Sequence, residues 1–524
     1  MELTDYIKVT RVDKVFLYES HQPRIEGTLV VSSYNLIFSQ SVAPVTQERS
    51  AELHGTKPNS NDISKTGRGH SCEEGGTSQT QSLQKPKEIW LLHRMIDVVE
   101  RRSNSTMLYL KCKDLRWLKL DIPGVETCTA VADSINVLKR LTSEEVRMCY
   151  PFYYRPLFKN HPRSPTREVP ALPIKGNWRI SNVNKDFLVC PSYARTVVVP
   201  QDTTDEEIIE SAQFRENGRF PVLAYSSSVT GAVLLRSGQP LVGPTGRRCR
   251  ADETLLSYVI SGDKKGLIID LRSIKQMEAA RAKGGGLEPE LHYTLWKKIN
   301  KRVELSSDSY VKFIDACCDE TLSMDKWLLR VESSGWLSAV KDVMQNACLT
   351  AQCLHVDGVS VLVHGTFGMD STLAVSSLAQ IILEPRLRTI NGFQELIERE
   401  WLSAGHPFQS RYASGPFSSK GKDNPPTFIL FIDCVFQEEE RLPLLNPLYE
   451  PLDEVTWPSV APQSIQLWSA FYLRKTYNNS HERLSEEIIK QIVEEDREAT
   501  ETVKELQKEL KRLQTLKELR DLDL

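Results

Sequence analysis

Residues 358–385 read GVSVLVHGTFGMDSTLAVSSLAQIILEP, and this stretch decides the fold. Its apolar start, residues 359–363, is typical of a buried strand. The polar, glycine-containing residues 364–372 predict a loop, and the apolar residues after them predict a helix that ends at Glu384, before Pro385. A strand, a loop and a helix in this order aim backbone N–H groups and the positive end of the helix at a bound anion.

The loop has the spacing of a catalytic phosphate-binding loop but lacks the residues that do the chemistry. In cysteine-dependent phosphatases it reads His-Cys, five residues of any kind, then Arg; the thiolate attacks phosphorus and the arginine binds phosphate oxygens. Here His364 is present, but Gly365 stands at the cysteine position and Ser371 at the arginine position. We therefore predict that the chain is not a working phosphatase. The alternative is a glycine-rich turn with no ancestral chemistry.

The composition is that of an ordinary soluble protein, with 40% hydrophobic and 26% charged residues in a chain of 524. This length predicts two or three domains. A net charge of −3 gives no global basic field, so we expect no nucleic-acid partner. The N-terminus lacks the apolar region of a signal peptide, and no apolar run reaches the roughly 20 residues of a membrane span. Eleven cysteines without a Cys-x-x-Cys pair predict reduced thiols in the cytosol, with no metal site and no cofactor.

The first 142 residues predict a small β-barrel that is closed by one helix. Short strand-like blocks alternate apolar and polar residues within 1–40 and 88–120, and residues 124–141 predict an amphipathic helix. Residues 41–87 contain almost no large apolar side chains, which predicts a disordered insertion between strands. Four basic residues are candidate lipid contacts, but they are dispersed, and we favour a solvated charged face over specific lipid recognition. They are Lys8, Arg11, Lys14 and Arg24.

A linker rich in proline and aromatic residues is predicted over residues 143–177, and a second domain over 178–475. In this domain apolar strands alternate with helices around the loop, which favours an α/β fold with a central sheet. The predicted strands are 187–190, 196–199, 221–225, 233–235, 267–269 and 359–363, and the predicted helices include 291–301 and 308–322.

The C-terminal residues 482–520 predict a coiled coil. Apolar residues fall on a and d positions over about four heptads, and Asp496 is the single polar a position, which favours a selective dimer. The alternative is one amphipathic helix that folds back on its own domain. The predicted partner-binding residues are Ile489, Ile492, Val503, Leu506, Leu510 and Leu513, with Ala499 in the same stripe.

Six further segments occur in a fixed order around the loop. They are RSGQPLVGPTGRR (236–248), LIIDLRS (267–273), ARAKGGGLE (280–288), WLLRVESSGWL (327–337), RTINGFQELIEREWLSAGHPF (388–408) and FILFIDCVFQ (428–437). Together with the loop they resemble the myotubularin family of phosphoinositide 3-phosphatases, and its inactive members in particular. The resemblance covers most of residues 1–437 and 446–524, and it implies that the N-terminal barrel is a PH-GRAM domain, a PH-like β-barrel.

The resemblance also implies roles for single residues. In the degenerate loop, His364, Gly365, Thr366, Phe367, Gly368, Met369, Asp370 and Ser371, the active pattern is kept at His364, Gly368 and Asp370. Asp370 is where active members carry the acid that protonates the leaving group; here we expect it to cap the following helix instead. Two lipid-contacting asparagines are replaced by Gln276 and Ala280, and one basic pocket residue by Pro407. Arg411 matches a second basic residue and supports weak phosphoinositide binding.

After residue 437 the chain departs from the family, because a helical stretch that completes the phosphatase domain is missing. We therefore expect the second domain to be truncated there, with reduced stability if apolar surface is exposed. No other thiol is placed to replace the nucleophile, since neither Cys353 nor Cys434 lies in a loop with a suitable arginine.

The resemblance implies an inactive, regulatory family member. It would bind an active myotubularin-related phosphatase through the coiled coil, as a heterodimer or in part as a homodimer, and change that partner's activity, stability or location. We expect a cytoplasmic protein with peripheral, weak phosphoinositide contact at endomembranes. The alternatives are a phosphoinositide-binding adaptor without a phosphatase partner and a residual phosphoinositide phosphatase.

Overall fold

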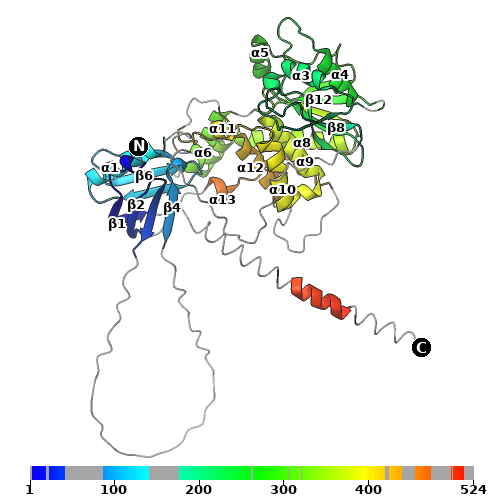
Figure 1. Ribbon diagram of the computed structural model, residues 1–524. Coiled ribbons are helices and arrows are strands. Elements are labelled where there is room, and N and C mark those ends of the chain that lie inside the picture. The colour runs from blue at the N-terminus through cyan, green and yellow to red at the C-terminus, as the bar shows by residue number, and fades with distance from the viewer. Residues whose placement is uncertain are drawn as a thin grey trace, which may run out of the picture. The chain divides into compact units, whose positions relative to one another are not determined.

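The computed structural model describes residues 3–18, 23–41, 87–140, 176–260, 262, 264–304, 306–319, 322–418, 424–439, 455–473, 497, 500–510 and 512. They fall into two compact units, one from residues 3–110 and 117–140 and the other from residues 111–116 and 176 onward. Both contain strands and helices, so the predicted mixed α+β class is confirmed (Figure 1). Apart from their end residues, the predicted insertion (41–87) and linker (143–177) lie outside the described residues. So do Ile489, Ile492 and Leu513.

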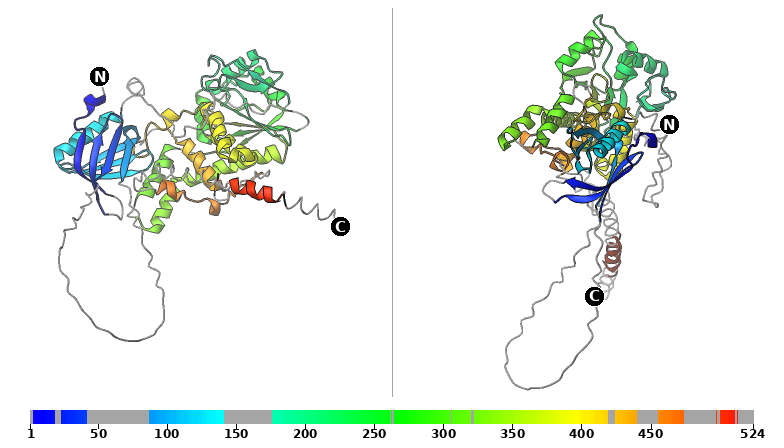
Figure 2. Two further views of the ribbon diagram at one scale, coloured as in Figure 1. Left: turned by 60° about the horizontal axis from the view of Figure 1, so that its bottom comes forward. Right: turned by 90° about the vertical axis from the view of Figure 1, so that its left-hand side faces the viewer.

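The first unit is a seven-stranded sheet with one long helix, α1 (Val125–Leu138) (Figures 1 and 2). The strand order is β4-β3-β2-β1-β7-β6-β5, and the pairs β1–β2, β2–β3, β3–β4 and β1–β7 are antiparallel. The strands are β1 (Arg11–Tyr18), β2 (Ile25–Val31), β3 (Asn35–Gln40), β4 (Glu88–Leu92), β5 (Ile96–Arg101), β6 (Met107–Cys112) and β7 (Trp117–Asp121), with short 3₁₀ turns η1 (Leu3–Tyr6) and η2 (His93–Met95).

Alternating burial explains how this sheet and its helix form one core. On β6, Leu108 and Leu110 are fully buried, while Met107, Tyr109 and Lys111 are partly exposed. This alternation is the period of a strand with one apolar face. Helix α1 buries Val131, Ile135 and Leu138 at helical spacing. An amphipathic helix thereby covers the apolar side of the sheet.

The second unit is built on a five-stranded sheet with β14 (Val361–His364) at its centre. The order is β10-β11-β14-β12-β13; only β10 and β11 pair antiparallel, and the other pairs are parallel. The remaining strands are β10 (Val222–Ser226), β11 (Val233–Ser237), β12 (Gly266–Asp270) and β13 (Trp296–Asn300), while β8 (Trp178–Ser181) and β9 (Val197–Pro200) form a separate antiparallel pair.

The apolar run of β14 is continuous because helices cover both faces of the sheet. Val361 and Val363 lie in one core cluster with residues of α8 and α9, whereas Leu362 lies in a cluster on the opposite face with residues of α4. All three side chains are fully buried. Both faces must therefore be apolar, as expected for a central parallel strand.

Helices complete the second unit. Helices α8 (Trp336–His355), α9 (Ser371–Leu383) and α12 (Thr427–Glu439) pack on one another and on the sheet. The other helices are α3 (Asp205–Phe214), α4 (Arg250–Tyr258), α5 (Ile274–Ala282), α6 (Ser307–Cys318), α7 (Met324–Ser334), α10 (Ile390–Ile397), α11 (Phe408–Arg411) and α13 (Ser469–Tyr472). Shorter turns are η3 (Glu216–Gly218), η4 (Pro385–Arg388), the π-type η5 (Glu398–Leu402) and η6 (Pro462–Ser464).

Two sequence predictions in this unit are wrong. The helix predicted over 291–301 is a turn followed by β13: Leu291 and Leu295, which set the helical spacing, are 81% and 41% exposed, while Tyr293 and Trp296 enter the core. The strand predicted over 187–190 is a loop that the buried Asn184 organises, accepting from the Cys190 N–H (2.9 Å) and donating to the Cys190 carbonyl (2.9 Å).

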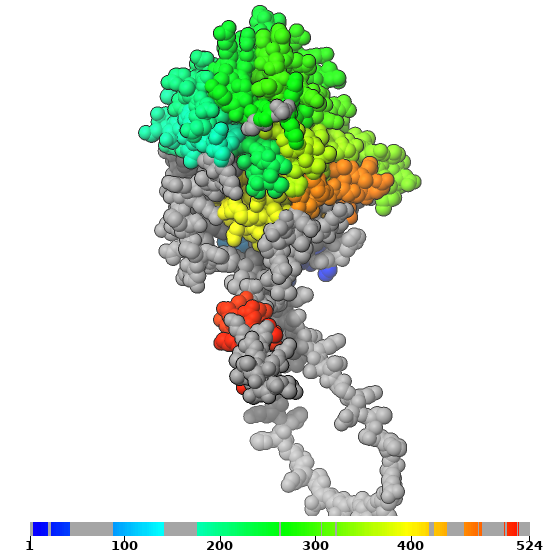
Figure 3. All heavy atoms as spheres, turned by 90° about the vertical axis from the view of Figure 1, so that its right-hand side faces the viewer, coloured from blue at the N-terminus to red at the C-terminus, as the bar shows by residue number. Residues whose placement is uncertain are grey.

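Residues 455–473, which follow the predicted departure from the family pattern, pack on the same core. The hydroxyl of Tyr472 donates to Asp433 on α12 (2.8 Å), and Trp336 Nε1 on α8 donates to the same carboxylate oxygen (2.8 Å). In the space-filling view the orange atoms of this segment lie directly against the yellow and green surface of the unit (Figure 3). Apolar residues of α12 such as Leu430 and Phe431 are fully buried. Within the described part, no helix has the length and apolarity needed to span a membrane.

Residues 500–510 form a helix whose predicted apolar stripe is open to solvent. Val503, Leu506 and Leu510 are 42%, 64% and 57% exposed. Their spacing of three and four residues places them on one face.

Candidate functional site

The loop between β14 and α9 lies at the carboxyl end of the central strand. Ser237 of β11, Asp270 of β12 and His364 of β14 are register partners, so the segments that leave all three strands meet at this edge. β14 lies between β11 and β12, which both precede it in the sequence. In parallel sheets, crevices for ligands form where the strand order changes in this way.

A cavity of about 180 Å³ opens over the loop. Six residues of the degenerate loop (364–371) line it, together with Thr372 of α9, residues that follow β12 and β13, and residues near α11 and α12. The lining residues are Leu271, Arg272, Gln276, Val303, Gly365, Thr366, Phe367, Gly368, Asp370, Ser371, Thr372, Arg411, Pro425 and Thr427. The two remaining residues of the degenerate loop lie elsewhere: His364 is fully buried, and Met369 packs against the core.

Three loop carbonyls are fixed by donors from the protein interior. The Gln239 N–H donates to the Thr366 carbonyl (3.2 Å), and Arg219 Nη2 donates to the Gly368 carbonyl (2.8 Å). His406 Nδ1 lies 2.8 Å from the Met369 carbonyl, which accepts, so the Nδ1 atom carries the proton. These donors set the orientation of three peptide groups in the loop.

The N–H groups of the loop consequently point the other way. In a trans peptide the C=O of one residue and the N–H of the next are antiparallel, so the N–H groups of Phe367, Met369 and Asp370 point away from these donors. Within the described residues, no N–H from Thr366 to Thr372 has a hydrogen-bond acceptor. These N–H groups are therefore available to an anion at the cavity side of the loop.

The two glycines of the loop differ in whether the backbone requires a glycine at their position. Gly368 has φ +68°, and a Cβ there would lie 2.3 Å from the Ser237 carbonyl oxygen, so only glycine fits. Gly365 has no such restriction; its nearest neighbour would be Thr372 Oγ1 at 3.2 Å. Gly365 and Ser371, at the nucleophile and clamp positions of the sequence motif, both line the cavity and carry no thiol and no positive charge.

Asp370 does not cap α9, so that prediction is wrong. It stands at the N-cap position, but its side chain accepts no hydrogen bond from the helix. Instead its two carboxylate oxygens accept from Arg411 Nε (3.0 Å) and Nη2 (2.6 Å), and Oδ1 also accepts from the Thr427 hydroxyl (3.2 Å). A bidentate pair with an arginine is a stronger partner than a backbone N–H.

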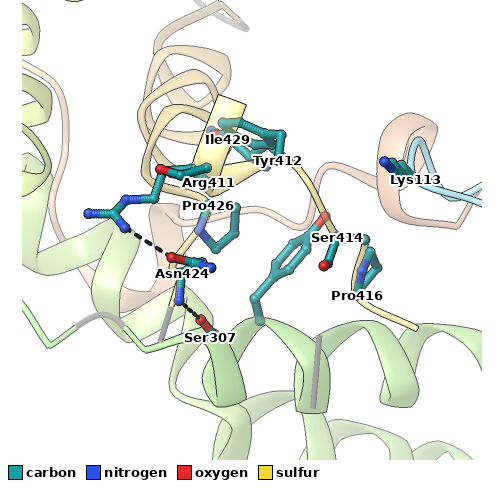
Figure 4. Close-up of a pocket in the computed structure, with 12 residues that line it drawn as sticks. Lys113, Ser307, Arg411, Tyr412, Ser414, Pro416, Asn424, Pro426 and Ile429 are labelled. Atoms are coloured by element: carbon teal, nitrogen blue, oxygen red, sulfur yellow. Dashed lines mark hydrogen bonds between the residues drawn. The ribbon is translucent and has the colours of Figure 1, made fainter. Parts of the chain in front are cut away.

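Arg411, the predicted lipid contact, ends α11 and lines the cavity. Besides its bond to Asp370, its Nη1 donates to Asn424 Oδ1 (3.2 Å), and the Asn424 N–H donates to Ser307 Oγ (2.7 Å) (Figure 4). A smaller pocket of about 50 Å³ lies on this other side of Arg411, against Tyr310 and Tyr412. The arginine is thus held from both sides.

A buried network of charges beneath the loop was missed in the sequence. Arg215 donates to both carboxylate oxygens of Asp252 (2.9 and 2.6 Å) and to Glu288 (2.7 Å), and Glu288 Oε2 lies 3.3 Å from His364 Nε2. Burial alone raises the pKa of Glu288, but His364 and Arg215 outweigh it and hold the pKa below its ordinary value of 4.5. Tyr293 also donates to Asp252 (2.8 Å).

Arg219, which holds the Gly368 carbonyl, has no carboxylate partner among the described residues. It is fully buried and also donates to the Ala404 carbonyl (2.8 Å) and to Ser192 Oγ (2.7 Å), and its guanidinium lies 4.4 Å from the centre of the Tyr193 ring. Burial lowers its pKa. No local sequence signal marks it, because its partners lie up to 185 residues away.

The other predicted site residues have structural roles. Gln276 reaches the cavity and also caps α5, where its side chain accepts from the Ser273 N–H (2.9 Å). Ala280 is buried in α5, and Pro407 precedes α11. Neither alternative thiol lines the cavity: Cys434 is fully buried in α12, and burial raises the pKa of Cys353 to about 11.

Comparison with known proteins gives the family. A model of the myotubularin-like phosphatase domain matches residues 156–445. The chain is 38% identical to Myotubularin-related protein 9 of Mus musculus, over 98% of this chain and 99% of that protein. It is 39% identical to Myotubularin-related protein 9 of Homo sapiens, over 98% of both. It is also 33% identical to Phosphatidylinositol-3-phosphate phosphatase MTMR7 of Homo sapiens, over 68% of this chain and 56% of that protein. The chain therefore belongs to the myotubularin family.

Proposed function

We propose that this chain is a catalytically inactive myotubularin that binds an active myotubularin-related phosphatase and regulates that partner's activity, stability or location. One observation carries the loss of catalysis: Gly365 and Ser371 stand where the cysteine-phosphatase motif needs its nucleophile and its arginine. Without a thiolate no phosphocysteine forms, and without the arginine the phosphoryl oxygens lose a bidentate, charge-assisted contact. Among the described residues that line the cavity there is no cysteine to supply a replacement thiolate for a residual phosphatase activity.

The C-terminal helix supports a partner-binding role. Val503, Leu506 and Leu510 are exposed at coiled-coil spacing, and an exposed narrow apolar stripe is the usual surface for a partner helix. Ile489, Ile492 and Leu513 extend the same stripe in the sequence. We propose that residues 482–520 form a coiled coil with an active relative, with a homodimer as the competing assembly.

The N-terminal unit supports a PH-GRAM domain, since it combines a seven-stranded sheet with a helix on its apolar side. Its basic residues give little support for specific lipid binding. Lys8 pairs with Asp133 (2.7 Å), Arg11 with Asp13 (3.0 Å), and the Arg24 guanidinium lies 4.3 Å from the centre of the Phe16 ring. We propose only a weak, peripheral membrane contact on the cytoplasmic side of endomembranes, which the partner reinforces.

A pull-down from cytosol tests the proposal. The baits are the full chain, a chain that ends at Ser480, and full-length Leu506→Lys with its matched control Glu505→Lys, which adds a positive charge beside the stripe. We expect an active myotubularin-related phosphatase to be recovered by the full chain and the control, and lost from the other two. Recovery by all four baits would move the interface to the folded units.

Failure of every bait to recover a phosphatase would reject the regulatory role and favour the lipid adaptor. Sedimentation with liposomes that contain phosphatidylinositol 3-phosphate, with and without residues 1–142, would then test that function. A phosphate-release assay on the purified full chain tests the residual enzyme directly, and measurable turnover would contradict the proposal.

A further inference from the structure

The cavity over the loop already contains an anion, and that anion is a side chain of the protein. Asp370 lies on the cavity wall at the positive end of α9, next to the unpaired N–H groups of the loop. Both of its carboxylate oxygens accept from Arg411, at 3.0 and 2.6 Å. A carboxylate in this position occupies the same kind of donor that a phosphate would need.

Every side-chain nitrogen of Arg411 already donates a hydrogen bond within the protein. Nε and Nη2 donate to Asp370, and Nη1 donates to Asn424, which Ser307 holds in turn (Figure 4). The Arg411 and Asp370 side chains are 14% and 22% exposed, so the pair is largely shielded from water and screened little by salt. His406 does not compete for Asp370, because burial lowers its pKa and its protonated Nδ1 faces the Met369 carbonyl.

The second cation of the cavity is neutralised in the same way. Arg272 donates to both oxygens of Asp270, through Nε (2.9 Å) and Nη2 (2.7 Å), and also to Gln239 and to the Gly286 carbonyl (2.9 Å). Among the described residues of the cavity lining, Arg272 and Arg411 are the two that carry a positive charge. Each is matched by one carboxylate, so the lining and its partners carry no net positive charge to attract a phosphate dianion.

We infer that Asp370 is an internal competitor for the anion position and that it excludes phosphate and phosphorylated head groups from the loop cavity. The loop backbone remains arranged for an anion, so residue 370 decides whether one binds. This inference stands independently of the proposed partner binding, because it concerns a different surface and a different ligand.

Isothermal titration of the full chain with inorganic phosphate tests this assignment. For wild type we expect no saturable binding at millimolar phosphate. Asp370→Asn removes the negative charge that competes with phosphate for Arg411, at nearly constant side-chain shape. We expect the phosphate affinity of this variant to exceed that of wild type by about ten- to a hundredfold. The double variant Asp370→Asn, Arg411→Met should lose this gain, and a soluble inositol 3-phosphate head group should follow the same order.

Asp205→Asn is the matched control, since it removes a carboxylate from another ion pair, Asp205–Arg179 (2.7 Å), on α3 and β8. It should leave phosphate binding as in wild type. A folded Asp370→Asn protein, judged by circular dichroism, that binds phosphate no better than wild type would overturn the inference. Equal gains in Asp370→Asn and Asp205→Asn would do so as well.

A measurement on wild type covers the case in which Asp370→Asn does not fold. Phenylglyoxal modifies accessible arginines, and mass spectrometry maps the sites. If Asp370 excludes phosphate, tens of millimolar phosphate should leave the modification rate of Arg411 unchanged within about twofold of a chloride control. Protection of Arg411 that saturates with phosphate would show that phosphate displaces Asp370, and the inference would be wrong.

Discussion

The loop differs between its interior side, where hydrogen bonds fix the backbone, and its cavity side, where the catalytic side chains are absent. On the interior side, Arg219, His406 and Gln239 each fix one loop carbonyl, and Gly368 fits against the backbone of β11. On the cavity side, the nucleophile and arginine positions of the motif hold a glycine and a serine. The two arginines that line the cavity are paired with carboxylates of the protein. The contrast means that the shape of such a loop belongs to the fold, whereas its chemistry rests on a few replaceable side chains.

The strongest test of the interior side is Arg215→Met. It leaves Asp252 and Glu288 buried without their common partner, and breaking a buried ion pair by removing one member costs about 3–5 kcal/mol. Urea denaturation measures the loss. The matched control is Arg302→Met, whose pair with Glu304 is more than half exposed, and its effect should stay below about 1 kcal/mol. Equal effects would show that the network under the loop adds nothing.

Substitution of the two glycines compares the interior side and the cavity side within the loop itself. Gly368→Ala places a Cβ 2.3 Å from a carbonyl oxygen at a positive φ, and we expect it to lower the free energy of unfolding by roughly 2–4 kcal/mol. Gly365→Ala meets only the Thr372 and Ser371 hydroxyls, at 3.2 and 3.6 Å, and should cost less than about 1 kcal/mol. Thermal unfolding of both variants gives the comparison, and a reversed order would refute it.

Acid should weaken the interior side through Glu288. Its pKa in the folded protein is depressed below 4.5, so its stabilising contribution is full above that pH and is lost as the pH falls toward the folded value. One such proton adds up to about 1.4 kcal/mol per pH unit to the slope of stability against pH. Glu288→Gln should flatten this slope between pH 4.5 and 3. An unchanged slope would assign the acid sensitivity to other carboxylates.

The smallest expected effect concerns catalysis. Gly365→Cys restores a thiol at the motif position, but Ser371 supplies no bidentate contact and Asp370 is bound to Arg411, so we expect no detectable hydrolysis of phosphatidylinositol 3-phosphate. Phosphate release is the readout, with the wild-type chain as the control. Measurable turnover by this single variant would show that the cavity side retains more chemistry than its side chains indicate.

The sequence predicted those parts of the fold whose signal is local. The run of apolar residues gave β14 and α9 within about two residues, because burial on both sides leaves a continuous apolar pattern. The prediction from the sequence was wrong at β13, where exposed leucines have the spacing of a helical face. It also failed for the side-chain partners of the loop: Arg215 and Glu288 lie 73 residues apart, and Asp370 and Arg411 lie 41 apart. Pairings of this kind are set by tertiary structure and leave no periodicity.

The order of strands has a consequence for how the protein is made. β14 occupies the middle of its sheet but is the last of the five strands in the sequence, and the contact from Val233 to Ser360 spans 127 residues. On the ribosome, β10–β11 and β12–β13 therefore form two half-sheets with open edges that wait for the strand between them. Contacts of such long range form slowly, and open edges invite aggregation. Only residues 361–364 can pair with both edges, so we expect the nascent chain to be most prone to aggregation before this strand emerges.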